Sequence, residues 1–187
     1  MALNKNNILL RGFIGSIGKQ LVIRQRGSKT ILSNSPKINP NRLPTSKQQQ
    51  ILKKFKWATK YAISAVKDPD LKLLYQAAAA EGQSAYNVAV SDAFQPPVLS
   101  ELNTKGYTGQ PGDKISVLAI DNFMVKTVHF AIIKDGAILE EGDGIKDENG
   151  LQWHYSTKKL NRNVYCTVIR LVAQDLPGNQ ATLEQIL

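Results

Sequence analysis

Short apolar segments separated by turn signals fill the second half of the sequence, and this pattern constrains the fold more than any other feature. The segments are PVLSEL, KISVLAID, TVHFAII, AILEEG, LQWHY, VYCTVIRLVAQD and ATLEQI. Turn-forming residues lie between them, as at Lys134-Asp135-Gly136 and Glu148-Asn149-Gly150. About seven short strands in about 90 residues, without a helical period, are typical of a β-sandwich. We therefore predict an all-β sandwich of residues 96–187.

Alternation within these segments predicts which side chains face the core. Residues two apart on a strand share a face, so one apolar row per strand should point inward. The predicted inward rows are Ile115, Val117 and Ala119, and Ile169, Leu171 and Ala173. Trp153 is expected to fill the space between the two sheets.

Residues 1–95 are predicted to form a small β-hairpin followed by two or three helices. Two β-like runs, QLVIRQ and KTILSN, flank a turn at Arg26-Gly27-Ser28. Pro36, Pro40 and Pro44 then favour an extended connector. The fold class is therefore α+β in two parts, with a boundary between residues 95 and 96.

Helix signals follow the connector. Thr45 and Gln48 match a capping box, Asp68 precedes Pro69 as a helix start, and a third helix is expected from about Ser84 to Phe94. LKLLYQAAAAE forms the second helix, which Gly82 ends. The predicted core face of the first helix contains Ile51, Phe55, Ala58, Ala62 and Val66, widened by Leu52 and Ile63.

Charge is distributed very unevenly along the chain. Residues 1–67 contain fourteen Lys or Arg residues and no Asp or Glu, whereas the whole chain has a net charge of +9. Such a segment favours an anionic partner, with a solvated basic surface as the plain alternative. The candidate binding residues are Arg24, Arg26 and Lys29 in the hairpin and Lys53, Lys56 and Lys60 in the first helix. Trp57 lies beside this lysine stripe, where it could stack on a base or flank the core, and we favour the core.

Gly12, Gly15 and Gly18 precede the hairpin at intervals of three. A phosphate-binding loop would need glycine where Phe13 stands and Ser or Thr where Gln20 follows Lys19. Nucleotide binding is therefore excluded on spacing. We expect these glycines to permit a close approach of two backbones, within the chain or between subunits.

The sandwich half resembles bacterial immunoglobulin-like domains. The resemblance is carried by Ala119-Ile120-Asp121, Ala173-Gln174-Asp175, Asp175-Leu176-Pro177-Gly178-Asn179 and Trp153-His154-Tyr155. It departs from the antibody subgroup, because the chain has no pair of cysteines and Tyr165 is adjacent to Cys166.

The N-terminal half is similar to a group of uncharacterised bacterial proteins. These combine a glycine-spaced start, a basic hairpin and a Pro-Thr-x-x-Gln helix cap. Here the matching residues are Gly12, Gly15 and Gly18, the turn Gly27-Ser28-Lys29-Thr30, and Pro44-Thr45 with Gln48. The two resemblances cover nearly the whole chain and imply no activity.

No residue pattern indicates catalysis. His129 and His154 fall in predicted strands without a partner at recognisable spacing, and Cys166 is expected to be a buried thiol in a strand. We assign no catalytic, cofactor-binding or metal-binding residue and expect no cofactor.

Two sets of oxygen-bearing residues are candidate calcium ligands. The segment EEGDGIKDENG holds Glu140, Glu141, Asp143, Asp147 and Glu148, but its spacing does not match a twelve-residue calcium loop. A second set, Asp121, Asn122, Asp175 and Asn179, should lie near one end of the sandwich. Strand termination and turn capping are the favoured interpretation of the second set.

These features predict a non-enzymatic structural or interaction protein, specifically a component of a multi-copy bacterial or phage-like assembly. Its partners would be other protein subunits, including copies of itself as a homo-oligomer. The alternative is a sequence-independent nucleic-acid-binding protein that uses the acid-free half. No apolar run is long enough for a transmembrane segment. Without a recognisable signal peptide, we expect a cytoplasmic location or an assembly exported without one.

Overall fold

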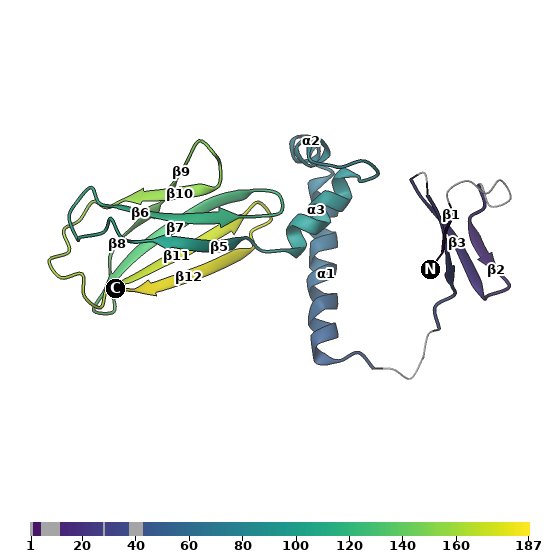
Figure 1. The fold of residues 1–187 in the computed structure, drawn as a ribbon, viewed down its shortest axis with the longest axis horizontal. Helices are drawn as coiled ribbons and strands as arrows, with labels where there is room; N and C mark the ends of the chain where they lie inside the picture. Colours follow the sequence, from purple (N-terminus) through teal and green to yellow (C-terminus); the bar gives the residue numbers. More distant parts are fainter. Residues whose placement is uncertain (1, 5–11, 28, 38–42) are drawn as a thin grey trace. The chain divides into compact units, whose positions relative to one another are not determined.

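The structure is a computed structural model that describes residues 2–4, 12–27, 29–37 and 43–187. Contacts divide the chain into two compact units (Figure 1). The first is formed from described residues of the segment 1–50 together with residues 80–83, and the second contains residues 51–79 and 84–187. Most helical residues of the half predicted to end at residue 95 therefore share a compact unit with the sandwich.

The first unit contains an antiparallel sheet with strand order β1-β4-β3-β2. The central pair, β3 (Leu21–Arg26) and β4 (Lys29–Asn34), is the predicted hairpin. Gly27 has a φ of +58°, which suits a tight turn, whereas Ser28 lies outside the described residues. Strands β1 (Ala2–Asn4) and β2 (Gly15–Ile17) were not predicted, because three residues are too few to show a period. Pro40 of the predicted connector also lies outside the described residues.

Three helices follow, and the two predicted N-terminal caps, at Thr45 and Asp68, are present. In α1 (Ser46–Ala65), the Thr45 N–H donates to Oε1 of Gln48 at 2.9 Å and the Gln48 N–H donates to Oγ1 of Thr45 at 3.3 Å. This reciprocal pair confirms the capping box. Asp68 accepts two backbone N–H bonds at the start of α2 (Pro69–Ala77), and Ser84 accepts one at the start of α3 (Ala85–Phe94). Helix α2 ends at Ala77 and does not reach Glu81, where the sequence had placed its end.

The predicted core face of α1 is wrong for its large side chains. Ile51 is 56% exposed and Phe55 is 50% exposed. Ala58 and Ala62 are buried, as predicted, together with Ala65, which was not part of the predicted face. Small side chains let α1 lie close to α2 and α3, where Ala62 and Ala65 pack with Tyr75, Ala85 and Ala89. Ile51 and Phe55 share this side of the helix but lie before the part that α2 and α3 cover, so they stay about half exposed.

Residues 96–187 form two antiparallel four-stranded sheets (Figure 1). One has the order β5 (Val98–Asn103), β6 (Lys114–Ile120), β10 (Gln152–Ser156), β9 (Ile145–Lys146). The other has the order β12 (Gln180–Ile186), β11 (Val168–Asp175), β7 (Val125–Lys134), β8 (Ala137–Asp143). All seven predicted strands are present, and β9 is additional. The chain is an α+β protein with a sandwich-like β part.

The core of the sandwich lies between these sheets. The six residues predicted to face inward, on β6 and β11, are each at most 1% exposed. Trp153 is 6% exposed and belongs to the same cluster, as predicted. Phe130 is fully buried, and its ring stacks on Tyr155 with centroids 5.5 Å apart. The alternation of apolar and polar residues along β6 and β11 therefore predicted correctly which side chains are buried between the sheets.

Cys166 contradicts its predicted environment. It is exposed and lies in a turn before β11, with a φ of +57°. The segment VYCTVIRLVAQD is therefore not one strand, because Tyr165 and Cys166 form a turn and the strand begins at Val168. Among the described residues, the helices include none with the length and apolarity to cross a membrane.

His129 on β7 lies opposite Asp143 on β8, with Nδ1 of His129 2.9 Å from Oδ1 of Asp143. Nε2 of His129 is also 3.5 Å from Oε2 of Glu141. The hydrogen bond to Asp143, aided by Glu141 and opposed by burial, raises the pKa of His129 above its ordinary value of 6.5.

We expect Asp143→Asn to lower the pKa of His129, measured by NMR titration of the ring protons. A pKa raised on folding means that the protonated pair stabilises the fold below pH 6.5 and loses this contribution as the pH rises through the raised pKa. Asp147→Asn is the control, because the hydrogen bond that Asp147 Oδ1 accepts comes from the N–H of Glu148. An unchanged His129 pKa in Asp143→Asn would contradict the assigned cause.

Candidate interaction surfaces

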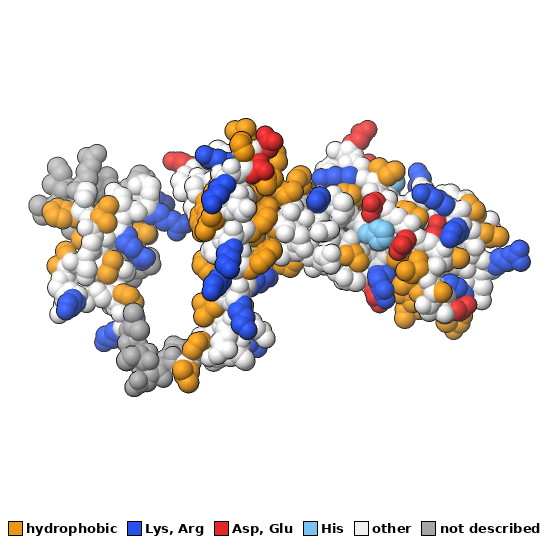
Figure 2. Space-filling model, turned by 180° about the vertical axis from the view of Figure 1, so that it is seen from behind, with side chains coloured by type: hydrophobic (Ala, Val, Ile, Leu, Met, Phe, Trp, Pro, Cys, Tyr) orange, Lys and Arg blue, Asp and Glu red, His pale blue; other side chains and the backbone are white. Residues whose placement is uncertain are grey.

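The lysine row of α1 is exposed, as predicted. Lys53, Lys56 and Lys60 recur at spacings of three and four, which places them on one side of a helix. All three are exposed, and none forms an ion pair with another described residue. Figure 2 shows basic side chains spaced along this helix with hydrophobic side chains beside them.

An apolar row lies next to the lysine row on α1. It consists of Ile51, Leu52, Phe55 and Ile63, each about half exposed. The Phe55 ring contacts Phe94 edge-on with centroids 6.3 Å apart, and the ammonium of Lys54 lies 5.2 Å from the centre of the Phe94 ring. A helix that exposes apolar and basic rows side by side has the composition of a protein-binding surface.

Trp57 flanks the core, which is the favoured of its two predicted roles, and is not buried in it. Its side chain stacks on Tyr61 with ring centroids 6.1 Å apart, and the residue remains 43% exposed. It belongs to neither buried cluster within the described residues. The residue thus flanks the core and keeps part of its ring open to a ligand.

The hairpin presents its three basic residues on one face. Arg24 and Arg26 are two apart on β3 and therefore share a face, and Lys29 is directly opposite Arg26 in the register of β3 and β4. All three are exposed, whereas Ile23 and Thr30 on the opposite face are buried. Like charges opposite each other repel, so an anion on this face would stabilise the hairpin.

Gly12, Gly15 and Gly18 have φ values of +87°, +136° and +58°. A Cβ atom added to any of them would meet no described atom within 4 Å. Glycine is therefore favoured at these positions by the positive φ values, and no close contact with another described residue requires it. The expected approach between subunits stays a prediction.

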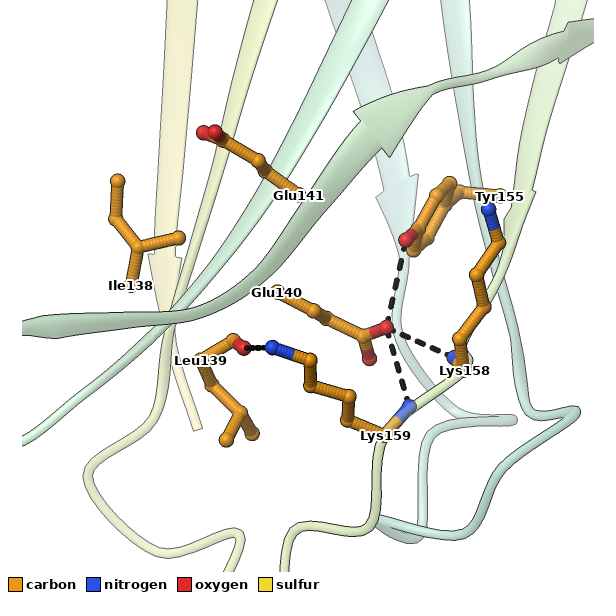
Figure 3. A pocket seen from close by; sticks show the side chains of 7 residues that line it. All are labelled: Ile138, Leu139, Glu140, Glu141, Tyr155, Lys158 and Lys159. Carbon is orange, nitrogen blue, oxygen red and sulfur yellow. Dashed lines mark hydrogen bonds between the residues drawn. The ribbon is translucent and has the colours of Figure 1, made fainter.

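A pocket of about 430 Å³ lies beside Glu140 (Figure 3). Oε2 of Glu140 accepts hydrogen bonds from the backbone N–H groups of Lys158 and Lys159 at 2.8 and 3.2 Å and from the Tyr155 hydroxyl at 3.4 Å. The carboxylate thereby links β8 of one sheet to the segment that follows β10 of the other. Its lining contains no Ser, Thr, Cys or His. We therefore interpret Glu140 as a structural residue that connects the two sheets.

Sequence reasoning missed Asp92 on α3, which the fold brings to Asp121 and Asp175. The two asparagines of the second candidate calcium set are hydrogen-bond donors here. The side-chain amide of Asn122 donates to Oγ of Ser91 at 3.1 Å, and that of Asn179 donates to Oδ2 of Asp175 at 2.7 Å. Asp92 lies in the last turn of α3, where the helix dipole disfavours a carboxylate. This unfavourable position is the sequence feature that could have identified Asp92 as a candidate functional residue. In the described part of the chain, the acids of EEGDGIKDENG do not converge in this way.

No protein-family model matches this sequence, and no curated protein sequence matches it. Among solved structures, one similar chain is an engineered protein with a crystal structure at 1.98 Å resolution. The likeness has a TM-score of 0.36 at 14% sequence identity and covers 55% of this chain. It spans only a quarter of the engineered chain, at 25%.

Proposed function

We propose that this protein is a non-enzymatic subunit of a multi-copy assembly. In this assembly, the basic and apolar rows of α1 in one copy lie against the β8–β9 edge of the next copy. The observation that carries the proposal is the pairing of exposed apolar and lysine rows on α1. A purely electrostatic partner would need the lysines alone, whereas a protein interface uses both.

The β8–β9 edge has the complementary composition. Glu141, Asp143 and Asp147 are exposed there and supply negative charge. Ile138 and Ile145 are also 57% and 66% exposed on the same edge. Both strands are at the edge of their sheets, so nothing in the described sandwich pairs with their outer sides. Because the two surfaces are different patches of one chain, they would join copies head to tail.

We further propose that the sandwich is immunoglobulin-like. The supporting observation is the strand order β5-β6-β10-β9 in one sheet and β12-β11-β7-β8 in the other. In chain order this corresponds to A-B-E-D and G-F-C-C′, the arrangement in which immunoglobulin-like domains combine an ABED sheet with a GFC sheet. Loops at its ends would then be presented to partners.

Charge reversal tests the assembly. The triple variant Lys53→Glu, Lys56→Glu, Lys60→Glu is expected to weaken self-association at least about tenfold, measured by analytical ultracentrifugation across a concentration series. Glu141→Lys with Asp143→Lys and Asp147→Lys should do the same, and mixing the two variants should restore association. Lys105→Glu with Lys126→Glu is the matched control on the sandwich, where both lysines are exposed. A wild-type chain that stays monomeric at high concentration would contradict the proposal.

The second candidate function, sequence-independent nucleic-acid binding, is favoured by Trp57, whose open ring lies beside the lysine row. Stacking aromatics next to basic residues are typical of single-strand binding. The same variants separate the two functions. For nucleic acid, the lysine variant should lose retention of a single-stranded oligonucleotide, and mixing with the acidic-edge variant should not restore it.

A further inference from the structure

Three carboxylates meet where α3 joins one end of the sandwich. Asp92 lies in the last turn of α3, Asp121 directly follows β6, and Asp175 ends β11. One carboxylate oxygen from each lies within 4.8 Å of the others. Asp92 and Asp175 are fully buried. Residues far apart in the sequence thus place three acids around one point.

Backbone and amide donors hold two of these carboxylates in place. Oδ2 of Asp121 accepts the N–H groups of Phe123 and Met124 at 3.2 and 3.0 Å. Oδ1 of Asp175 accepts the N–H groups of Gly178 and Asn179 at 2.8 and 2.6 Å. The Asn179 amide donates to Oδ2 of Asp175 and to the carbonyl oxygens of Asp92 and Ala93. Each acid is therefore oriented before any ligand binds.

The third carboxylate, Asp92, is held by a tyrosine pair. The Tyr75 hydroxyl donates to Oδ2 of Asp92 at 2.5 Å, and the Tyr61 and Tyr75 hydroxyl oxygens are 2.9 Å apart. The Tyr75 ring packs on Phe123 with centroids 4.5 Å apart. Asp92 is therefore fully buried beside an aromatic pair, where an uncompensated charge is costly.

Two buried oxygens of this cluster have no partner. Oδ1 of Asp92 and Oδ1 of Asp121 are both inaccessible to solvent and accept no hydrogen bond from any described residue. No Lys or Arg in the described chain forms an ion pair with any of the three acids. Within the described residues, no basic side chain compensates the charge of these acids.

We propose that a divalent cation of the calcium type binds between Asp92, Asp121 and Asp175 and fastens α3 to the sandwich. Calcium takes oxygen ligands at about 2.3–2.6 Å, so oxygens on opposite sides of one ion lie about 4.8 Å apart. The three carboxylates meet this limit. Binding would also supply the unpartnered oxygens with a ligand.

Calcium fits the donor set better than other common cations. Zinc prefers nitrogen and sulfur, and no His or Cys belongs to the cluster. Magnesium demands shorter, strictly octahedral contacts and retains several waters, which suits an enclosed site poorly. The site is independent of the charge-complementary surfaces on α1 and the β8–β9 edge.

Terbium luminescence tests the site directly. Terbium substitutes for calcium. Tyr75, whose hydroxyl is hydrogen-bonded to Asp92, would sensitise the emission of bound terbium on tyrosine excitation. We expect emission from the full chain that calcium displaces, and millimolar calcium should raise the Tm relative to EDTA. Asp121→Asn should weaken binding at least about tenfold, since ligand charge sets calcium affinity.

The sign of the stability change separates a cation site from a capping role. In EDTA, Asp121→Asn should be at least as stable as wild type, because it removes charge repulsion while keeping a side-chain oxygen for the turn. In calcium, wild type should be the more stable of the two. Asp147→Asn with Glu148→Gln is the control for binding at the exposed acidic segment. The proposal is overturned by absent calcium-displaceable emission, by a Tm that calcium leaves unchanged, or by emission that only the control variant loses.

Discussion

Gly109→Ala is expected to destabilise the sandwich by at least about 3 kcal/mol, because it combines backbone strain with a steric clash. Gly109 has a φ of +91°, and a Cβ at this position would lie 2.2 Å from the carbonyl oxygen of Asn161. It would also lie 2.9 Å from Cγ1 of Val164. Relief requires the two segments to separate, which stretches the 2.8 Å hydrogen bond from the Asn161 N–H to the Gly109 carbonyl.

Separation would also disturb a buried polar network. The Asn161 amide donates to the Tyr107 hydroxyl and to Oγ1 of Thr167, both at 3.0 Å. Urea denaturation followed by tryptophan fluorescence measures the effect, because Trp153 lies in the sandwich core.

Gly112→Ala is the matched control. Gly112 has nearly the same φ, +93°, but an added Cβ would meet nothing within 4 Å. We expect it to cost only about 1–2 kcal/mol, the strain of a left-handed residue with a side chain. Equal losses in the two variants would show that conformation alone explains Gly109 and that the clash contributes nothing.

Phe130→Ala is expected to cost about 3–5 kcal/mol, since it removes a large buried ring and leaves a cavity. Phe130 is fully buried on β7 and stacks on Tyr155. The backbone at Gly144 is packed directly against the Phe130 ring, since a Cβ added to Gly144 would lie 2.5 Å from that ring. The cavity left by the truncation would therefore be bordered on this side by backbone. Calorimetric unfolding of the purified chain provides the measurement.

Tyr165→Ala controls for the loss of an aromatic residue. Tyr165 is 73% exposed in the turn before β11, so its truncation should change stability by no more than about 0.5 kcal/mol. A similar loss in both variants would contradict the assignment of Phe130 to the core.

The strands were predictable because each combines an alternating apolar row with a nearby turn signal. Ile115, Val117 and Ala119 show the period of two directly, and burial between two sheets requires it. Strands β1, β2 and β9 have two or three residues each, so no period could identify them. Their pairing depends on neighbouring strands and not on their own residues.

How much of the predicted face of α1 is buried could not be read from hydrophobicity alone. Ile51, Phe55, Ala58, Ala62 and Ala65 follow one another at spacings of four and three, so they share one side of the helix. The described structure buries only the part of this side from Ala58 to Ala65, where α2 and α3 pack. Only the neighbours, Tyr75 and Ala89, decide this outcome.

The basic candidate residues and the acidic cluster differ in how far the sequence alone could predict that they lie together. Lys53, Lys56 and Lys60 share a face through helical spacing, which is local and readable. Asp92, Asp121 and Asp175 meet through tertiary structure, because α3 docks on the ends of β6 and β11. Sequence reasoning could place Asp121 and Asp175 at one end of the sandwich, but the third acid arrives from a helix.

The exposed thiol of Cys166 limits the covalent chemistry of any assembly. The chain holds one cysteine, and it lies in a turn that is open to solvent. A molecule with one thiol can make one intermolecular disulfide, so oxidation joins copies in pairs and each pair is then chemically complete. Oxidation can therefore link two copies but cannot build a longer covalent series. Any longer series of copies must be held by noncovalent contacts, and its length would not change when a reducing agent is added.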